Sequence, residues 1–294
     1  MMKETSFKNS FGYILYGNNW LIEKPKAVIV IVTGMAEHSE RYDDFASFLN
    51  KHYMNVVCID HYGQGKNGNL GHGAPNFFAK YTKTVDDLIL KLKDEYNLPV
   101  YIFSHSMGSF IAQNYIENYH HADKVVICGS NYMGIMAKLG YLIAKMVVTK
   151  KNRENPAGIL NSLSIGAYEK SAKGEDSKNA WISFNKDNYH AYDKDPLSGY
   201  HCSNGFYYEF MKGLSTLNKK ENLKTIDKKL PILIIAGDSD PVGKNSKGPT
   251  KLNEIYHKYG LNSSLITYKN MRHEVLNEVN HMDVYKDVVN FYKN

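Results

Sequence analysis

Six short runs of apolar residues recur along this chain, and segments with helical periodicity separate most of them. The first run, Ala27–Val32, is apolar at every position, which predicts a strand covered on both faces. The other expected strands are Asn55–Asp60, Val100–Ser104, Lys124–Cys128, Ile232–Ala236 and Ser264–Tyr268. The expected helices are Arg41–His52, Thr84–Tyr96, Met107–Tyr119, Lys247–Tyr259 and Met282–Tyr292. Strands that alternate with helices predict an α/β protein with a doubly wound, mostly parallel sheet.

One long segment interrupts this alternation. Between Asn131 and Lys229 no run has a strong strand pattern, and the sequence is rich in Gly, Asn, Ser and Tyr with helical stretches. Long segments between the core strands of a compact domain are usually functional. We therefore expect a core formed by residues 1–130 and 230–294, and a mainly helical cap or lid formed by residues 131–229.

The most apolar helix candidate, Met133–Val148, lies at the start of this insertion. Two interpretations of it stay open. The helix packs against the core of the protein, or it lines an acyl tunnel or makes a transient contact with a membrane surface. No stretch of the chain approaches the roughly 18 apolar residues that a membrane-spanning helix needs.

The most informative motif is Val100–Gly108, where a strand pattern enters the turn Ser104-His105-Ser106-Met107-Gly108 and a helical pattern leaves it. This strand–turn–helix context is what a nucleophile elbow requires. The central residue of an elbow is strained, so the residues two before and two after it must be small. Gly108 is the usual glycine, and Ser104 replaces the other one with a residue that is still small. We therefore predict that Ser106 is a nucleophile.

A serine hydroxyl needs a base to take its proton, and the base needs an acid to orient it. After such an elbow the acid and then the histidine follow on loops after late strands. Among twelve histidines, His273 alone has this chain order and follows a late strand, Ser264–Tyr268. Two carboxylates, Asp238 and Asp240, compete for the acid position after the strand Ile232–Ala236.

Hydrolysis also needs donors for the oxyanion that develops on the carbonyl oxygen. In this arrangement they are two backbone N–H groups, one after the nucleophile and one in the loop after an early strand. We assign them to Met107 and to Met35, which follows the strand Ala27–Val32.

Several segments together resemble the monoacylglycerol lipase and lysophospholipase branch of the α/β-hydrolases, which also contains the serine aminopeptidases. That branch reads HGxxEHxxRY in its first loop, and the chain matches this pattern except at Thr33. Its usual elbow GHSMGG is SHSMGS here, with Ser104 and Ser109 in place of glycines. The other matching segments, which extend the resemblance over essentially the whole chain, are Asp60–Gly65, Asp195–Tyr200, Gly237–Val242 and Arg272–Glu278.

The resemblance implies an α/β-hydrolase fold with a helical cap. It also assigns the acid to Asp240, and Asp238 is then expected to form hydrogen bonds within its own turn. It implies a serine hydrolase that cleaves carboxylic esters of single-acyl lipids, monoacylglycerols or lysophospholipids, through an acyl-enzyme. Thr33 puts the rate and the substrate preference in question. For Glu37, His38 and Arg41 we weigh a polar cluster that fixes the loop against direct contact with substrate.

Three alternatives stay open. A short-chain esterase or thioesterase would use the same residues. An aminopeptidase would need an acidic cluster in the cap to recognise a free amine, and the acids there, Glu169, Glu175 and Asp176, are scattered. A catalytically silent binding protein would be expected to lack the nucleophile, the acid or the histidine.

Composition excludes other classes. The net charge is +6, but the 36 Lys and Arg are spread along the chain, and no basic run predicts a nucleic-acid surface. Three widely spaced cysteines form no metal or redox pair, and the N-terminus lacks the apolar run of a signal peptide, so we expect a soluble, cytoplasmic protein. The GxGxxG match at Gly63–Gly68 lacks the strand-to-helix context of a nucleotide site. We expect no metal and no cofactor, and the sequence leaves the oligomeric state open.

Overall fold

The computed structural model describes residues 1–294 and contains one eight-stranded sheet. Its strands lie in the order β1-β2-β4-β3-β5-β6-β7-β8. The pairs from β4 to β8 are parallel, and β1 and β2 join one edge as antiparallel strands. The strands are β1 (Met2–Lys8), β2 (Ile14–Trp20), β3 (Ala27–Val32), β4 (Met54–Ile59), β5 (Val100–His105), β6 (Lys124–Cys128), β7 (Ile232–Gly237) and β8 (Ser263–Tyr268). This confirms the prediction of a mostly parallel sheet.

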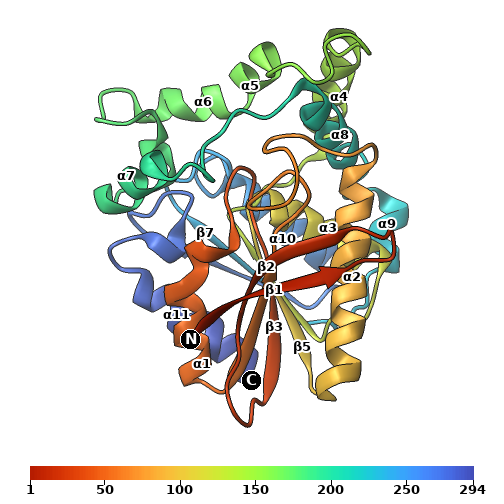
Figure 1. Ribbon diagram of the computed structural model, residues 1–294, viewed down its shortest axis with the longest axis vertical. Coiled ribbons are helices and arrows are strands. Elements are labelled where there is room, and N and C mark those ends of the chain that lie inside the picture. The colour runs from red at the N-terminus through yellow and green to blue at the C-terminus, as the bar shows by residue number, and fades with distance from the viewer.

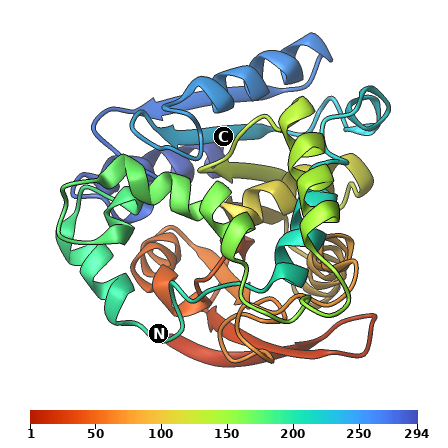
Figure 2. The same cartoon turned by 90° about the horizontal axis from the view of Figure 1, so that it is seen from above.

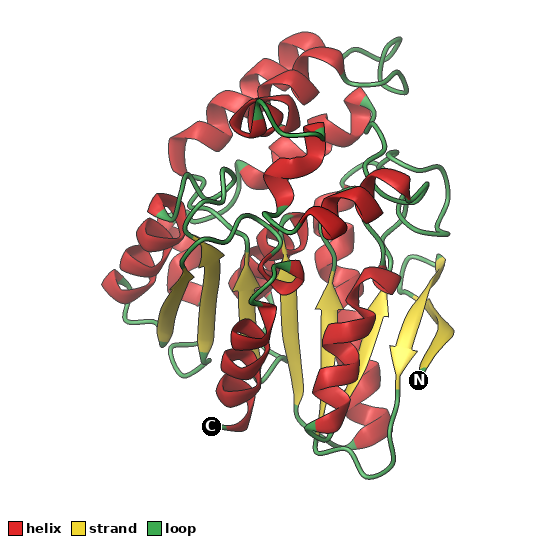
Figure 3. Cartoon of the chain, turned by 90° about the vertical axis from the view of Figure 1, so that its left-hand side faces the viewer, coloured by secondary structure: helices red, strands yellow, loops and turns green.

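Helices cover both faces of the sheet (Figures 1 and 3). One face packs against α1 (Asp43–Lys51) and α11 (His281–Lys293), and the other against α2 (Phe77–Tyr96), α3 (Met107–Asn118) and α10 (Lys247–Lys258). Alternate residues of β3 enter the two cores: Val28, Val30 and Val32 on the second face, Ile29 and Ile31 on the first. Because both faces are buried, the strand is apolar at every position.

The six strands expected from the sequence are all present within a residue or so of their expected ends, but β1 and β2 were missed. Strand β1 forms the edge of the sheet and β2 lies between β1 and β4, and the two carry Lys, Glu, Asn and Gly residues, which are depleted in strands. Helix α2 also begins at Phe77, seven residues before the expected Thr84. Four 3-10 turns complete the elements: η1 (Ser39–Tyr42), η2 (Lys170–Ala172), η3 (Lys178–Ile182) and η4 (Val275–Asn277).

The segment between β6 and β7 is helical and lies over the carboxyl ends of the strands (Figures 1 and 3). Figure 2 looks down on these helices from above the sheet. Two of these helices pack onto the core: α8 contacts α2, and α9 contacts α3. The helices of the segment are α4 (Gly134–Val147), α5 (Gly158–Leu163), α6 (Ile165–Glu169), α7 (Lys186–Lys194), α8 (Asn204–Leu214) and α9 (Lys220–Thr225).

Helix α4 has two unlike faces. Its small residues Ala137 and Ala144 are buried where α4 packs against α8. Its large apolar side chains point to solvent: Ile135, Met136, Leu139, Leu142 and Met146. Helix α4 therefore packs against the body of the protein by one face only. No helix of the structure combines the length and the apolar character needed to cross a bilayer.

Candidate active site

Ser106 lies at the sharp turn between β5 and α3, with φ 53° and ψ −118°. Non-glycine residues rarely adopt a positive φ, and such strained positions cluster at functional sites. The neighbouring positions explain how the turn is tolerated. A Cβ at Gly108 would lie 2.1 Å from the carbonyl oxygen of Val32, so glycine is required there. Ser104 is fully buried, and its hydroxyl donates to the carbonyl of Val126 at 2.7 Å, so serine fits where glycine is usual.

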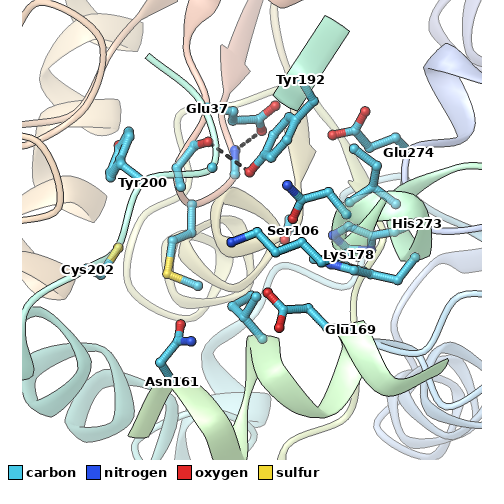
Figure 4. A pocket seen from close by; sticks show the side chains of 18 of the residues that line it. Glu37, Ser106, Asn161, Glu169, Lys178, Tyr192, Tyr200, Cys202, His273 and Glu274 are labelled. Carbon is cyan, nitrogen blue, oxygen red and sulfur yellow. Dashed lines mark hydrogen bonds between the residues drawn. The ribbon is translucent and has the colours of Figure 1, made fainter. Parts of the chain in front are cut away.

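His273 and Asp240 come together at the ends of the last strands, 33 residues apart in the chain. Nδ1 of His273 lies 3.1 Å from both carboxylate oxygens of Asp240, and both residues are buried. Asp240 is held in turn by the backbone N–H of Val242 at 2.8 Å. Nε2 of His273 has no hydrogen-bond partner, and the residue lines the same pocket as Ser106 (Figure 4). Asp240 thus fixes the orientation of the His273 ring through Nδ1, and Nε2 has no competing partner.

Asp238, the competing carboxylate, is turned away from this histidine. Its Oδ1 accepts hydrogen bonds from the hydroxyl of Ser239 at 2.9 Å and from the backbone N–H of Asn270 at 3.0 Å. It therefore ties together the two loops that follow β7 and β8, as expected for a turn residue. Of the two carboxylates, only Asp240 contacts the imidazole of His273.

The loop after β3 passes close to the nucleophile. A Cβ built on Gly34 would lie 3.0 Å from the Cβ of Ser106. The backbone N–H groups of Met35 and Met107 donate no hydrogen bond within the chain. Met35 and Ser106 line the same pocket, and Met107 is the first residue of α3, directly after the turn. Two unused donors therefore flank the serine, which is the arrangement that an oxyanion requires.

A buried ionic cluster supports this loop. The Glu37 carboxylate accepts hydrogen bonds from the Gly34 N–H and from the Tyr42 hydroxyl, and it lies 3.1 Å from Nδ1 of His105. Burial opposes ionisation of Glu37, but His105 and Arg41 outweigh it, so the pKa of Glu37 lies below its ordinary value. Burial likewise lowers the pKa of His105, but Glu37 raises it more, and the net shift is upward. Both shifts favour the charged forms of Glu37 and His105 beside the nucleophile.

Arg41 extends the cluster to the histidine loop. Its guanidinium donates two hydrogen bonds of 2.7 Å to Glu274, the residue after His273, and one of 3.1 Å to Glu37. Burial raises the pKa of Glu274, but Arg41 outweighs it and holds that pKa at about 2. These contacts favour the interpretation that Glu37 and Arg41 belong to a cluster that fixes the loops, over direct contact with substrate. Glu37 also lines the pocket, although it is buried and its carboxylate is bonded to Gly34, Tyr42, His105 and Arg41.

The segment between β6 and β7 braces the same loop from above. The carbonyl oxygen of Ala36 accepts hydrogen bonds from the Tyr192 hydroxyl at 3.0 Å and from the Gly199 N–H at 2.9 Å. Nε2 of His38 lies 2.7 Å from Asp195. Thr33, the departure from the family pattern, is fully buried, and its hydroxyl donates to Gln64 at 3.3 Å. Threonine at this position therefore belongs to the support of the loop.

A pocket that is partly open to solvent lies above Ser106 and His273 (Figure 4). Its floor is formed by the core loops and its roof by the segment between β6 and β7. Helix α4 contributes no residue to its lining, which makes the expectation of an acyl tunnel lined by Met133–Val148 wrong for this pocket. The lining residues from the roof include Asn161, Ile165, Glu169, Lys178, Trp181, Tyr192, Tyr200, Cys202 and Tyr207.

The sequence did not reveal these roof residues as part of a site. Tyr200 ends the segment Asp195–Tyr200 that matches the family pattern, but the other roof residues come from short helices and turns that carry no recognisable motif. Trp181 shows why one of them matters, since its ring centroid lies 5.2 Å from that of His273. No group of three or more His, Cys, Asp or Glu side chains is placed to hold a metal ion.

Comparison with known proteins places these observations in context. A model of the family described as serine aminopeptidase, S33, matches residues 23–280. The chain is 27% identical over 259 residues to the human protein named monoglyceride lipase, an alignment covering 84% of this chain and 76% of that one. It is 26% identical over 284 residues to phospholipase YtpA of Bacillus subtilis, covering 91% and 95% of the two chains.

Among solved structures, a thermostable carboxyl esterase from Bacillus coagulans superimposes with a TM-score of 0.87. The two chains are 24% identical, and the match covers 99% of this chain and 98% of the other. At this identity the likeness establishes the shared fold, the α/β-hydrolase fold that the sequence led us to expect.

Proposed function

The chain belongs to the serine aminopeptidase S33 family, and from that premise we propose that it is a serine hydrolase acting on carboxylic esters of single-acyl lipids. The observation that carries the proposal is the placement of three residues. Ser106 stands on a strained elbow, and His273, oriented by Asp240, lies in the same pocket. The names of the relatives, a monoglyceride lipase and a phospholipase, support lipid esters as the substrate class.

The proposed reaction has two steps. His273 takes the proton of Ser106 as its oxygen attacks the ester carbonyl, and the N–H groups of Met35 and Met107 hold the oxyanion. Asp240 orients the imidazole and stabilises its charged form. The protonated His273 then donates its proton to the leaving alcohol. A water molecule, deprotonated by the same histidine, attacks the acyl-enzyme, releases the fatty acid and restores the serine.

The pocket supports a substrate with both apolar and polar parts. Met35, Tyr200, Cys202 and Tyr207 offer apolar and aromatic surface, whereas Asn161 offers polar atoms. A monoacylglycerol or a lysophospholipid has this composition. The length of the acyl chain that fits decides between a lipase and a short-chain esterase or thioesterase.

Residues 131–229 are proposed to act as a cap over a core of residues 1–130 and 230–294. The cap supplies the roof of the pocket, and α4 supplies the outer surface. The exposed apolar face of α4 carries Lys138 and Lys145 among its large apolar residues. This combination favours transient contact with a lipid surface, because apolar side chains enter the interface while lysines meet anionic head groups.

We further propose that the enzyme works in the cytoplasm. In support, Cys58, Cys128 and Cys202 are all buried as free thiols. Burial raises the pKa of each thiol, so they behave as small apolar side chains and not as reactive groups.

Labelling with a fluorophosphonate probe tests the proposal. Wild type should label and Ser106→Ala should not, while Ser109→Ala, which removes a buried hydroxyl three residues along the same turn, should still label. A series of p-nitrophenyl esters of increasing length then measures acyl preference. Absence of labelling in folded wild type would contradict the proposal and favour a silent binding protein.

Aminopeptidase activity is the second candidate. Glu169 lines the pocket, where it is placed to meet a free amine. Glu175 and Asp176 instead make ion pairs outside the pocket, with Arg272 and Lys186 respectively. One carboxylate is weaker support than the acidic cluster that this activity requires. Hydrolysis of alanine p-nitroanilide at a rate above that of the esters would favour this candidate.

A further inference from the structure

Two opposite charges reach into the pocket from its roof. Glu169 is the last residue of α6, and Lys178 is the first residue of η3. In Figure 4 the side chain of Lys178 extends across the pocket toward Ser106, and the carboxylate of Glu169 points into the same space. Both groups therefore face the position where an ester would be cleaved.

These two charges differ from the other charges around the site because they have no partner. Glu37, Arg41 and Glu274 satisfy one another in the buried cluster. Neither the ammonium of Lys178 nor the carboxylate of Glu169 makes a hydrogen bond or an ion pair, and they are more than 4.0 Å from each other. A gap between opposite charges at a pocket wall leaves room for a ligand that carries both charges.

The turn that carries Lys178 is fixed to the catalytic loop. The Glu274 N–H donates to the carbonyl of Ile182 at 2.7 Å, and the Arg272 guanidinium donates to the carbonyl of Ala180 at 2.6 Å. Tyr168, next to Glu169, packs on Trp181 with ring centroids 5.3 Å apart. The backbone segments that carry both charges are thus held in place relative to His273, as a specificity site requires of its support.

Another part of the pocket wall has a different character. In Figure 4 Tyr200 and Cys202 lie to the left of Ser106, and the side chain of Lys178 reaches past Ser106 toward them, while Glu169 lies below. We take the acyl chain to pack on the apolar surface of Tyr200 and Cys202, which leaves the alcohol part of the ester near Lys178 and Glu169.

We propose that Lys178 and Glu169 form a head-group subsite that selects esters whose alcohol part carries a phosphate and an ammonium group. Lys178 binds the phosphate and Glu169 binds the amine, so zwitterionic lysophospholipids are preferred over neutral monoacylglycerols. This inference rests on the proposed function, because it concerns the alcohol that leaves Ser106. It assigns a role to two residues that take no part in the chemical step.

The subsite makes a prediction whose sign differs between the two residues. Removing the positive charge of Lys178 should lower kcat/KM for every substrate that carries a phosphate. Removing the negative charge of Glu169 should lower kcat/KM for a zwitterionic substrate. It should raise kcat/KM for a purely anionic substrate, because Glu169 repels the phosphate when no amine is present. Neither change should affect a neutral head group.

The experiment compares three substrates with the same acyl chain: an acyl-glycerophosphoethanolamine, an acyl-glycerophosphoglycerol and a monoacylglycerol, all in neutral detergent micelles. Lys178→Gln should lower kcat/KM about tenfold for both phosphate esters and leave the monoacylglycerol within about twofold. Glu169→Gln should lower kcat/KM several-fold for the zwitterion and raise it for the anionic ester. Lys173→Gln, an exposed lysine of the same segment outside the pocket lining, is the matched control.

The result that overturns the subsite is an equal change, or no change, for all three head groups in both variants. Loss of alanine p-nitroanilide hydrolysis in Glu169→Gln would also overturn it and assign the carboxylate to a free amine. Labelling by fluorophosphonate and hydrolysis of p-nitrophenyl butyrate are measured in every variant. If wild type fails these two assays, the proposed function itself is wrong. If it passes them while the head-group ratios stay constant, only the subsite is wrong.

Discussion

The core and the cap contribute to the pocket in opposite ways. The core residues beside Ser106 are buried and held by several partners: Asp240 is fully buried, and Glu37 joins Gly34, Tyr42, His105 and Arg41 in one cluster. The cap residues that face the same space, such as Lys178 and Glu169, keep side chains without partners. A rigid core favours a fixed geometry for bond cleavage, whereas free polar groups in the cap remain available to the substrate. The proposed reaction therefore rests on core residues, and the proposed substrate preference rests on residues of the proposed cap.

The largest expected effect lies in the core. Asp240→Asn should lower kcat by about 10⁴-fold, because an amide no longer holds the proton of His273 on Nδ1 and leaves the wrong nitrogen available. Asp238→Asn is the matched control, since Asp238 lies two residues away and bonds only within the loops. It should keep kcat within about threefold. The measurement is kcat on a p-nitrophenyl ester, with circular dichroism to verify folding.

A larger loss of kcat in Asp238→Asn than in Asp240→Asn would contradict this assignment of the acid. It would assign the acid to Asp238 and leave the 3.1 Å contact between Asp240 and His273 as a structural one. Equal losses in both variants would indicate that the loops after β7 and β8 act as one unit.

The elements that hold the reactive residues could be predicted because each has a local physical cause. Continuous apolar runs such as Ala27–Val32 mark strands buried on both faces, and the elbow needs Gly108 because no Cβ fits there. The order Ser106, Asp240, His273 then follows from the order of the strands. The strands β1 and β2 have no such continuous apolar run. They carry polar residues, and Gly17 of β2 is required by the close approach of β4, where a Cβ would lie 2.1 Å from the carbonyl oxygen of Cys58.

The pocket roof could not be predicted for a different reason. Lys178, Glu169 and Trp181 meet at the site through tertiary contacts between short helices and turns, none of which has a periodic apolar pattern. The sequence identified Met133–Val148 as the notable part of the cap, because it is the most apolar. In the structure that helix forms the outer surface, and less apolar segments line the pocket.

A second prediction concerns the contact between core and cap. Glu117 of α3 accepts hydrogen bonds from the Asn218 N–H at 2.7 Å and from the Asn222 side chain at 2.9 Å. Burial raises the pKa of Glu117 from its ordinary value of 4.5 to about 7, although these hydrogen bonds oppose the rise. A carboxyl whose pKa is raised by folding stabilises the fold fully below pH 4.5 and loses that contribution as pH rises through 7.

Glu117→Gln should therefore remove part of the pH dependence of stability. Relative to wild type, the free energy of unfolding of the variant should increase by up to about 3 kcal/mol between pH 5 and pH 9. Urea denaturation at pH 5, 7 and 9 measures this difference. Glu221→Gln, an exposed carboxylate of α9, is the control and should leave the slope unchanged. Parallel curves for wild type and Glu117→Gln would mean that the contact between core and cap does not titrate in this range.

The smallest effect is expected on the outer face of the cap. The double variant Ile135→Ser and Met146→Ser removes two side chains that are 72% and 76% exposed, so folding stability should stay within about 0.5 kcal/mol. Binding to lipid vesicles should fall about tenfold, because each side chain loses apolar area that would enter the interface. The control is Leu90→Ser. Leu90 is an exposed apolar residue of α2, outside the proposed cap, and this variant should bind to vesicles like wild type.

Sedimentation with vesicles of neutral and of anionic lipid measures this binding, and activity on a water-soluble ester should be unchanged in all variants. Equal binding by the double variant and wild type would remove the lipid-contact role of α4, leaving the cap as a pocket roof alone. If instead the double variant loses activity on vesicle-borne substrate while keeping activity on the soluble ester, the cap has two separable tasks. Its inner residues select the head group, and its outer helix brings the enzyme to the surface where that substrate resides.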